Sequence, residues 1–266
     1  MTTTYAPKRP PARGHTVSID NIEIYYEDEG VGEPLVLLHG FGGCVQNWHP
    51  FAAKLSEHHR VIAVDLRGHG HSTNPDETFT HRQAARDVFL LLEKLRIDRF
   101  SAMGISSGGM TLLHMATSEP QRIESMVLVS ATSCFPDQAK AIMRGVSLGT
   151  MPEQVREMYR ECAKRGDEQI RQLISQFNAL ATNNDDMNFT ARTLSTITAR
   201  TLVVHGDRDR FFPVEIAVSL YRSIPDAALW IIPGGDHAPI YDPAVPFTST
   251  ALRFLDGPGS RSQRPA

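Results

Sequence analysis

The sequence contains little cysteine. Only three of its 266 residues are cysteines, at Cys44, Cys134 and Cys162, and no two of them form a C-x-x-C pair. Cysteines scattered in this way are typical neither of a disulfide framework nor of a metal site. We therefore expect three reduced and partly buried thiols in a cytoplasmic protein. We also expect no bound metal and no cofactor.

Long apolar runs and an excess of one charge are missing as well. No stretch of 18 apolar residues is present, which argues against a membrane span. The net charge of −3 indicates no basic surface for nucleic acid. The start of the chain, "MTTTYAPKRPPARG", carries charge and proline without a following apolar stretch, unlike a secretory signal. We expect residues 1–14 and 258–266 to be disordered.

What the sequence does contain is an alternation of strand-like and helix-like segments. A hairpin is predicted over 15–30, and apolar spacing predicts helices over 47–58, 80–95, 107–118 and 243–255. Apolar runs typical of strands covered on both faces are Pro34–Gly40, Arg60–Asp65, Arg99–Gly104, Ser125–Ala131, Arg200–Gly206 and Ala228–Gly234. This order predicts a mostly parallel eight-stranded sheet with helices on both faces.

One segment interrupts the alternation. Residues 133–198 contain only helix-like pieces, so we expect a core over 15–132 and 199–257 with a helical cap inserted between them. Ligands of open α/β sheets bind at the carboxyl ends of the strands. A helical cap at that edge would cover the binding site.

The stretch "GISSGG" is the first candidate for chemistry. Gly104, Ser106 and Gly108 fit the pattern G-x-S-x-G between a predicted strand and a predicted helix. A serine on so sharp a turn takes a strained backbone, and residues two positions away must be small. The N-terminus of the next helix favours negative charge. We predict Ser106 as a nucleophile; the alternative is a glycine-rich turn with a serine helix cap.

A serine nucleophile needs a base, and the base needs an acid. His237 lies in "GGDHAP", directly after the last predicted strand. Asp207 and Asp209 in "HGDRDRFFP" are both candidates for the acid, and either could instead belong to a turn. The order serine, aspartate, histidine is one of the known orders of a catalytic triad.

An oxyanion hole needs two N–H donors. Ser107 follows the predicted nucleophile and offers its backbone N–H. Phe41 in "HGFGG" is the predicted second donor, since the glycines beside it allow the backbone to approach closely. The alternative is an ordinary turn between a strand and a helix.

Taken in order, "HGFGG", "DLRGHGHS", "GISSGG", "TLVVHGDRDRFFP" and "GGDHAPIYDP" resemble the α/β-hydrolase superfamily from about residue 20 to about residue 256. The resemblance implies that Ser106 is the nucleophile and His237 the base. It also selects Asp209 over Asp207 as the acid. It implies further that Asp65 and Arg67 of "DLRGHGHS" have a structural role.

We expect a carboxylic ester hydrolase that forms an acyl-enzyme on small to medium hydrophobic esters. Ser106 argues against the dehalogenases and epoxide hydrolases of this fold, which use an aspartate nucleophile. Trp48, Met143 and Phe177 are candidate pocket residues, with core packing as the alternative. A lactonase, a perhydrolase or cofactor-free haloperoxidase, a C–C bond hydrolase and a small-molecule receptor of the same fold remain open. "HGFGGC" lacks the G-P-G turn typical of the C–C bond hydrolases. The oligomeric state is open too.

Overall fold

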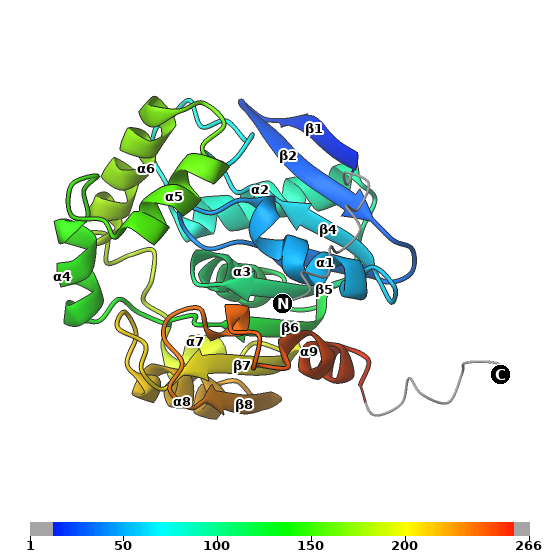
Figure 1. Cartoon of the computed structure of the whole chain (residues 1–266). Helices are drawn as coiled ribbons and strands as arrows, with labels where there is room; N and C mark the ends of the chain where they lie inside the picture. The colour runs from blue at the N-terminus through cyan, green and yellow to red at the C-terminus, as the bar shows by residue number, and fades with distance from the viewer. Residues whose placement is uncertain (1–12, 258–266) are drawn as a thin grey trace, which may run out of the picture.

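The computed structural model describes residues 13–257 of the chain. A twisted sheet forms the centre of the molecule (Figure 1). The strand order is β1-β2-β4-β3-β5-β6-β7-β8. The pairs β1/β2 and β2/β4 are antiparallel and all other pairs are parallel. The strands are β1 Arg13–Ile19, β2 Ile22–Glu29, β3 Pro34–Leu38, β4 Arg60–Val64, β5 Phe100–Ile105, β6 Ile123–Val129, β7 Arg200–Gly206 and β8 Ala227–Ile232. The predicted mostly parallel eight-stranded sheet is confirmed.

Helices pack on both faces of this sheet. Strand β3 illustrates why, since Val36 and Leu38 point into the core beneath α2, α3 and α8, while Leu35 and Leu37 point into the core beneath α1 and α9. Both faces of a parallel strand are therefore apolar. The helices named here are α1 His49–Leu55, α2 His81–Lys94, α3 Ser107–Ser118, α8 Val214–Ser223 and α9 Phe247–Leu255.

Two boundaries differ from the sequence prediction. Strand β1 begins at Arg13 and pairs with β2, so residues 13 and 14 belong to the sheet. The rest of the predicted disordered ends, 1–12 and 258–266, lies outside the described residues. The helix expected over 47–58 is divided into a 3-10 turn at Val45–Trp48 and helix α1. Pro50 favours this division because proline is well accommodated in the first turn of a helix.

The helices between β6 and β7 form a group of their own. They are α4 Asp137–Gly145, α5 Glu153–Cys162, α6 Asp167–Leu180 and the short α7 Ala191–Leu194. Figure 1 shows α4, α5 and α6 gathered at one end of the molecule. We call residues 133–198 the helical insertion. Six of its residues form a separate apolar cluster: Met151, Tyr159, Ala163, Ile170, Leu173 and Ile174.

Polar contacts attach the insertion to the loop after β4. The amide nitrogen of Gln169 donates to the backbone oxygens of Gly68 and Gly70, at 2.8 and 3.0 Å. That loop is itself tied to the core. Asp65 accepts from the backbone N–H groups of Val45 and His71, at 2.7 and 2.8 Å. Burial raises the pKa of Asp65 to about 6, against the effect of these two hydrogen bonds.

Arg67 is anchored from the same loop. Its Nε donates to Asp87 of helix α2 at 2.6 Å, and both side chains are almost completely buried. Breaking a buried ion pair leaves one charge uncompensated, which is costly. The contacts of Asp65 and Arg67 agree with the structural role that the sequence comparison implied.

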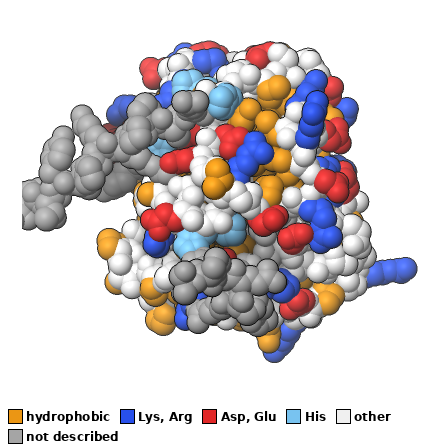
Figure 2. All heavy atoms as spheres, turned by 90° about the vertical axis from the view of Figure 1, so that its right-hand side faces the viewer, with side chains coloured by type: hydrophobic (Ala, Val, Ile, Leu, Met, Phe, Trp, Pro, Cys, Tyr) orange, Lys and Arg blue, Asp and Glu red, His pale blue; other side chains and the backbone are white. Residues whose placement is uncertain are grey.

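The surface facing away from the insertion is mixed in character. Figure 2 shows acidic and basic side chains interspersed with hydrophobic ones on this face. Such a surface presents no field of a single sign to a charged polymer. Among the described residues, no helix combines the length and the apolar character needed to cross a bilayer.

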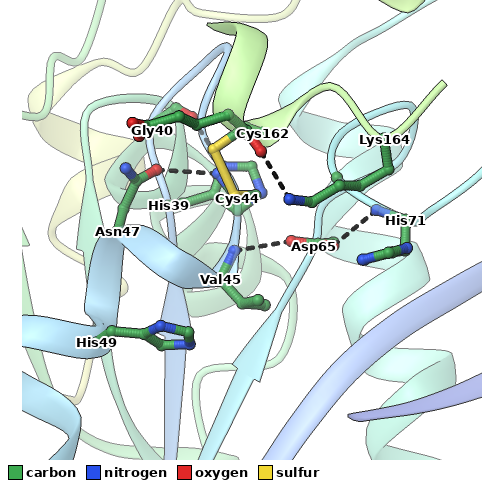
Figure 3. The surroundings of a disulfide bond; sticks show 12 residues. His39, Gly40, Cys44, Val45, Asn47, His49, Asp65, His71, Cys162 and Lys164 are labelled. Atoms are coloured by element: carbon green, nitrogen blue, oxygen red, sulfur yellow. Dashed lines mark hydrogen bonds between the residues drawn. A yellow bond between two sulfur atoms is a disulfide. The ribbon is translucent and has the colours of Figure 1, made fainter. Parts of the chain in front are cut away.

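The prediction of three reduced and partly buried cysteines is wrong for Cys44 and Cys162, which form a disulfide with their Cα atoms 5.5 Å apart (Figure 3). Cys134 is free as expected, but it is exposed rather than partly buried. The bond joins the loop after β3 to the last residue of α5. The partners are 118 residues apart, and only the folding of the insertion back onto the core brings them together. No local spacing in the sequence carries that information.

Removing this disulfide should destabilise the protein. Because the bond closes a long loop, we expect the Cys44→Ser/Cys162→Ser variant to lose about 2–4 kcal/mol of unfolding free energy. Cys134→Ser is the matched control and should stay near the wild-type value. Urea unfolding with and without a thiol reductant measures both effects. A reductant that destabilised the double variant as much as the wild type would contradict the assignment.

Candidate active site

The turn between β5 and α3 holds Ser106 in an unusual backbone conformation. Its φ is 50° and its ψ is −114°, outside the regions that residues with a β-carbon normally adopt. The side chain is partly exposed, whereas its neighbours Ile105 and Ser107 are buried. The turn therefore presents the Ser106 hydroxyl alone, as the G-x-S-x-G pattern predicted.

The glycines around Ser106 provide clearance. A β-carbon on Gly104 would lie 2.4 Å from the backbone carbon of Gly108, and one on Gly108 would lie 2.1 Å from the oxygen of Leu38. Gly109 faces a milder restriction, with a β-carbon 2.8 Å from that of Ala131. The expectation that residues two positions from Ser106 must be small is confirmed by these distances.

His237 and Asp209 meet Ser106 at the carboxyl ends of the strands. The Nε2 atom of His237 lies 3.0 Å from the Oγ of Ser106, and its Nδ1 lies 2.8 Å from an Oδ atom of Asp209. The three residues come from the loops after β5, β7 and β8. Parallel strands deliver residues 131 positions apart to one edge. Serine, histidine and carboxylate thus form one continuous hydrogen-bonded chain.

Asp209 is placed to act as the carboxylate of that chain. Its side chain is fully buried, and its second oxygen accepts from the backbone N–H groups of Phe211 and Phe212, at 2.7 and 3.1 Å. Burial alone would raise the pKa of Asp209, but the bonds from His237 and from these amides lower it overall. Asp207 is exposed and accepts instead from the Gly234 N–H at 2.6 Å, so it belongs to a turn.

The loop after β3 passes directly beside Ser106. A β-carbon on Gly40 would lie 3.6 Å from that of Ser106. The Gly43 N–H donates to the Gly40 oxygen at 3.0 Å, which makes Phe41 and Gly42 the central residues of a turn. Gly42 has a φ of +78°, a conformation that favours glycine. The turn leaves the Phe41 N–H outside its own hydrogen bond.

His39 fixes the start of this loop. Its Nδ1 bonds to the Gly40 oxygen at 2.7 Å, and its Nε2 accepts from the Leu66 N–H at 3.0 Å. Complete burial lowers the pKa of His39 to about 4, so the ring is neutral and can accept. On the other side of Ser106, Ser107 is the first residue of α3, and the N–H of a first helical residue has no partner within the helix.

Aromatic rings line the space beside His237. Phe41, Phe177 of α6 and Phe211 are all partly exposed, and their centroids follow one another at 5.0 and 6.5 Å. Phe211 lies 4.8 Å from the ring of His237. The loop after β3, the insertion and the loop after β7 each contribute one of these rings. The arrangement offers an apolar surface next to the Ser106 hydroxyl.

Two of the three predicted pocket residues lie elsewhere. Trp48 is 0% exposed and packs between the sheet, α1 and α9, and Met143 is 2% exposed in the core on the other face. Neither presents surface to a ligand, so the alternative of core packing holds for both. Their apolar side chains suited a core position and a pocket position equally well, so the sequence could not distinguish the two. Phe177 alone lies among the rings beside His237.

Two residues near the site escaped the sequence analysis. Phe211 follows Asp209 by two positions, and its place in "DRDRFFP" was a usable signal once the acid was chosen. Tyr159 of α5 packs against Gly42, where a β-carbon would lie 2.2 Å from its ring. Burial raises the pKa of Tyr159. The sequence offered no local signal for Tyr159, because its contact with Gly42 depends on how the insertion folds back onto the core.

The described part of the chain contains no arrangement of side chains typical of a metal-binding site. Within residues 13–257, no group of three or more His, Cys, Asp or Glu side chains is arranged to hold a metal ion. The donors gathered at Ser106 suit proton transfer and anion stabilisation instead.

Comparison with known proteins identifies the fold. A family model described as alpha/beta hydrolase fold matches residues 33–191, more than half of the chain. A candidate non-heme chloroperoxidase of Synechocystis sp. is 29% identical over 88% of this chain and 95% of its own. The pimeloyl-[acyl-carrier protein] methyl ester esterase of Aliivibrio salmonicida is 25% identical over 87% and 95% of the two chains.

Solved structures of the same fold also match. The meta-cleavage product hydrolase of Pseudomonas fluorescens IP01 superimposes with a TM-score of 0.78 and 20% identity, covering 91% of this chain and 97% of that one. The relatives named here differ in the reactions that their names describe. The likeness therefore reaches the fold and leaves the reaction to the site.

The glycine at the turn can be tested directly. We expect Gly104→Ala to lower the unfolding free energy by about 1–3 kcal/mol, because the added methyl group meets the Gly108 backbone. Gly145→Ala is the control, since a β-carbon there has nothing within 4 Å. Urea unfolding measures both. Equal stability of the two variants would mean that the turn relaxes at no cost.

Proposed function

Since the chain belongs to the α/β-hydrolase fold family, we propose that it is a serine hydrolase of carboxylic esters. The hydrogen-bonded chain from Ser106 through His237 to Asp209 is the observation that carries this proposal, with links of 3.0 and 2.8 Å. Distances of this size are what proton transfer from a serine hydroxyl requires. The family model covers Ser106 and ends before Asp209 and His237, so for these two residues the proposal rests on their hydrogen bonds.

Catalysis would proceed in two halves. His237 Nε2 takes the proton of the Ser106 hydroxyl while Oγ attacks the ester carbonyl, and the ion pair with buried Asp209 stabilises the imidazolium. His237 then gives that proton to the alcohol as it departs, and the acyl group remains bonded to the Ser106 oxygen as an acyl-enzyme. Water deprotonated by His237 releases the acid and restores Ser106.

The developing oxyanion needs donors that are already in place. The N–H groups of Phe41 and Ser107 would supply them, because both belong to segments that pass beside Ser106. Fixed donors stabilise the charged intermediate without reorganising during the reaction. The N-terminus of the 12-residue helix α3 adds a favourable field.

The acyl or alcohol group of the substrate would be hydrophobic. Phe41, Phe177 and Phe211 follow one another on the side of the site next to His237 and present apolar rings to it. Phe177 belongs to the helical insertion, which would thus act as a cap and wall the site on one side. Burying apolar substrate surface against these rings contributes affinity in proportion to the area covered.

The choice of acid gives a sharp comparison. We expect Asp209→Asn to lower kcat by about 10³–10⁴-fold, because an amide no longer stabilises the imidazolium. Asp207→Asn is the matched control and should keep kcat within about threefold, since an amide oxygen still accepts from Gly234. Steady-state kinetics on a p-nitrophenyl ester decide the matter. A larger loss for Asp207→Asn would refute the assignment of Asp209.

The nucleophile and the reaction class can be tested together. Ser106→Ala should lower ester hydrolysis by at least about 10⁴-fold and abolish labelling by a fluorophosphonate, which phosphonylates activated serines. The wild type should prefer hydrophobic p-nitrophenyl esters over charged ones. Lactones, vinylogous diketones and peroxide-dependent halogenation are the other arms of the panel. Faster turnover of any of these than of the esters would replace ester hydrolysis by that reaction.

A further inference from the structure

A second chain of serine, histidine and aspartate lies directly behind the first. The Oγ of Ser107 is 3.0 Å from Nε2 of His81, and Nδ1 of His81 is 2.6 Å from an Oδ atom of Asp186. The links of the first chain are 3.0 and 2.8 Å. The two chains start from neighbouring residues of the same turn, Ser106 and Ser107.

This second chain has no access to a substrate. His81 is 0% exposed, and Ser107 and Asp186 are each 2% exposed, whereas the His237 side chain is 24% exposed. A nucleophile needs room for the reacting carbonyl beside it. Ser107 therefore cannot work through its own hydroxyl, and any effect on the reaction must pass through its backbone.

Helix capping explains part of the arrangement. The two carboxylate oxygens of Asp186 accept from the backbone N–H groups of His81 and Arg82, at 2.8 and 3.1 Å, at the start of α2. Any residue except proline at position 81 would offer that N–H. Capping accounts for Asp186 but not for an imidazole placed between it and Ser107.

The carboxylate of Asp186 is charged in this setting. Burial alone would raise its pKa, but bonds from His114 and His81 lower it well below its usual range. Nδ1 of His81 is bonded to this carboxylate, and Nε2 of the same ring is bonded to the Ser107 hydroxyl. Without that ring, the buried Ser107 hydroxyl would lose this hydrogen bond, which is unfavourable.

We propose that His81 and Asp186 are positioning residues that hold Ser107 so that its backbone N–H stays directed at the oxyanion. The proposal rests on the ester hydrolysis proposed above, in which that N–H is an oxyanion donor. The Ser107 side chain is anchored at Oγ, which limits rotation of its peptide on the Ser106 side. Small displacements of an oxyanion donor cost rate, because the stabilisation depends on its preset direction.

The same contact links the insertion to the oxyanion hole. Asp186 belongs to the helical insertion and is 105 residues from His81. The second chain is therefore complete only while the insertion is docked on α2 and α3. Docking of the insertion and alignment of the Ser107 N–H thus become one event.

Ser107→Ala tests the proposal because it removes the hydroxyl and keeps the backbone N–H. We expect kcat to fall about tenfold with KM within about twofold, less than the ~10²–10³-fold effect of removing an oxyanion donor. A trifluoromethyl ketone, whose adduct with Ser106 carries the oxyanion, should lose about the same factor in affinity. Ser125→Ala is the matched control, since Ser125 is 1% exposed and bonded to Ser101 at 2.9 Å, at the opposite end of the strands.

Asp186→Asn and the double variant complete the design. Asp186 acts on Ser107 only through His81, so the two substitutions break the same chain of hydrogen bonds. The Ser107→Ala/Asp186→Asn double variant should therefore lose no more kcat than the worse of the two single variants. Wild-type kcat in folded Ser107→Ala, or an equal loss in Ser125→Ala, overturns the proposal. Should Asp186→Asn fail to fold, the comparison of Ser107→Ala with Ser125→Ala decides alone. Failure of the proposed function looks different, since Ser106→Ala would then keep its ester hydrolysis.

Discussion

The backbone of Ser106 is the constraint on which the rest of the site depends. Its φ of 50° is held from both sides, because its N–H donates to Val129 at 2.8 Å and its oxygen accepts from Met110 at 2.9 Å. Strand and helix thus oppose the relaxation of an unfavourable conformation. If the turn relaxed, the Ser106 hydroxyl would leave His237 and the Ser107 N–H would turn with it. One local conformation therefore positions two groups of the proposed mechanism.

The helical insertion is fastened on both sides of that turn. The disulfide from Cys162 to Cys44 holds it to the loop that carries Phe41, and Asp186 holds it to His81 and so to Ser107. Gln169 adds a third attachment at the loop after β4. The proposed oxyanion donors, Phe41 and Ser107, each lie next to one of these attachments. The insertion, which we propose walls the site, is in this way also connected to the groups that would stabilise charge there.

The sequence predicted what local patterns and strand order determine. Ser106 followed from two glycines between a strand and a helix, and His237 followed from its place after the last parallel strand. Strand position left Asp207 and Asp209 both open, and the resemblance to the α/β-hydrolase superfamily selected Asp209. The sequence did not predict which residues meet in contacts between distant parts of the chain. Cys162 and Asp186 meet Cys44 and His81 only because the insertion folds back, and apolar spacing is the same for a core residue such as Trp48 as for a pocket residue.

Two adjacent serines in chains of nearly equal geometry show that distances alone do not define an active site. His81 and His237 each bond a serine at 3.0 Å and a carboxylate within 2.8 Å. What separates them is access, since His237 keeps 24% of its side chain exposed beside a wall of aromatic rings and His81 keeps none. The buried chain of Ser107, His81 and Asp186 cannot receive a substrate, so its hydrogen bonds serve to hold the turn rigid. A rigid turn is what fixed stabilisation of charge beside Ser106 requires.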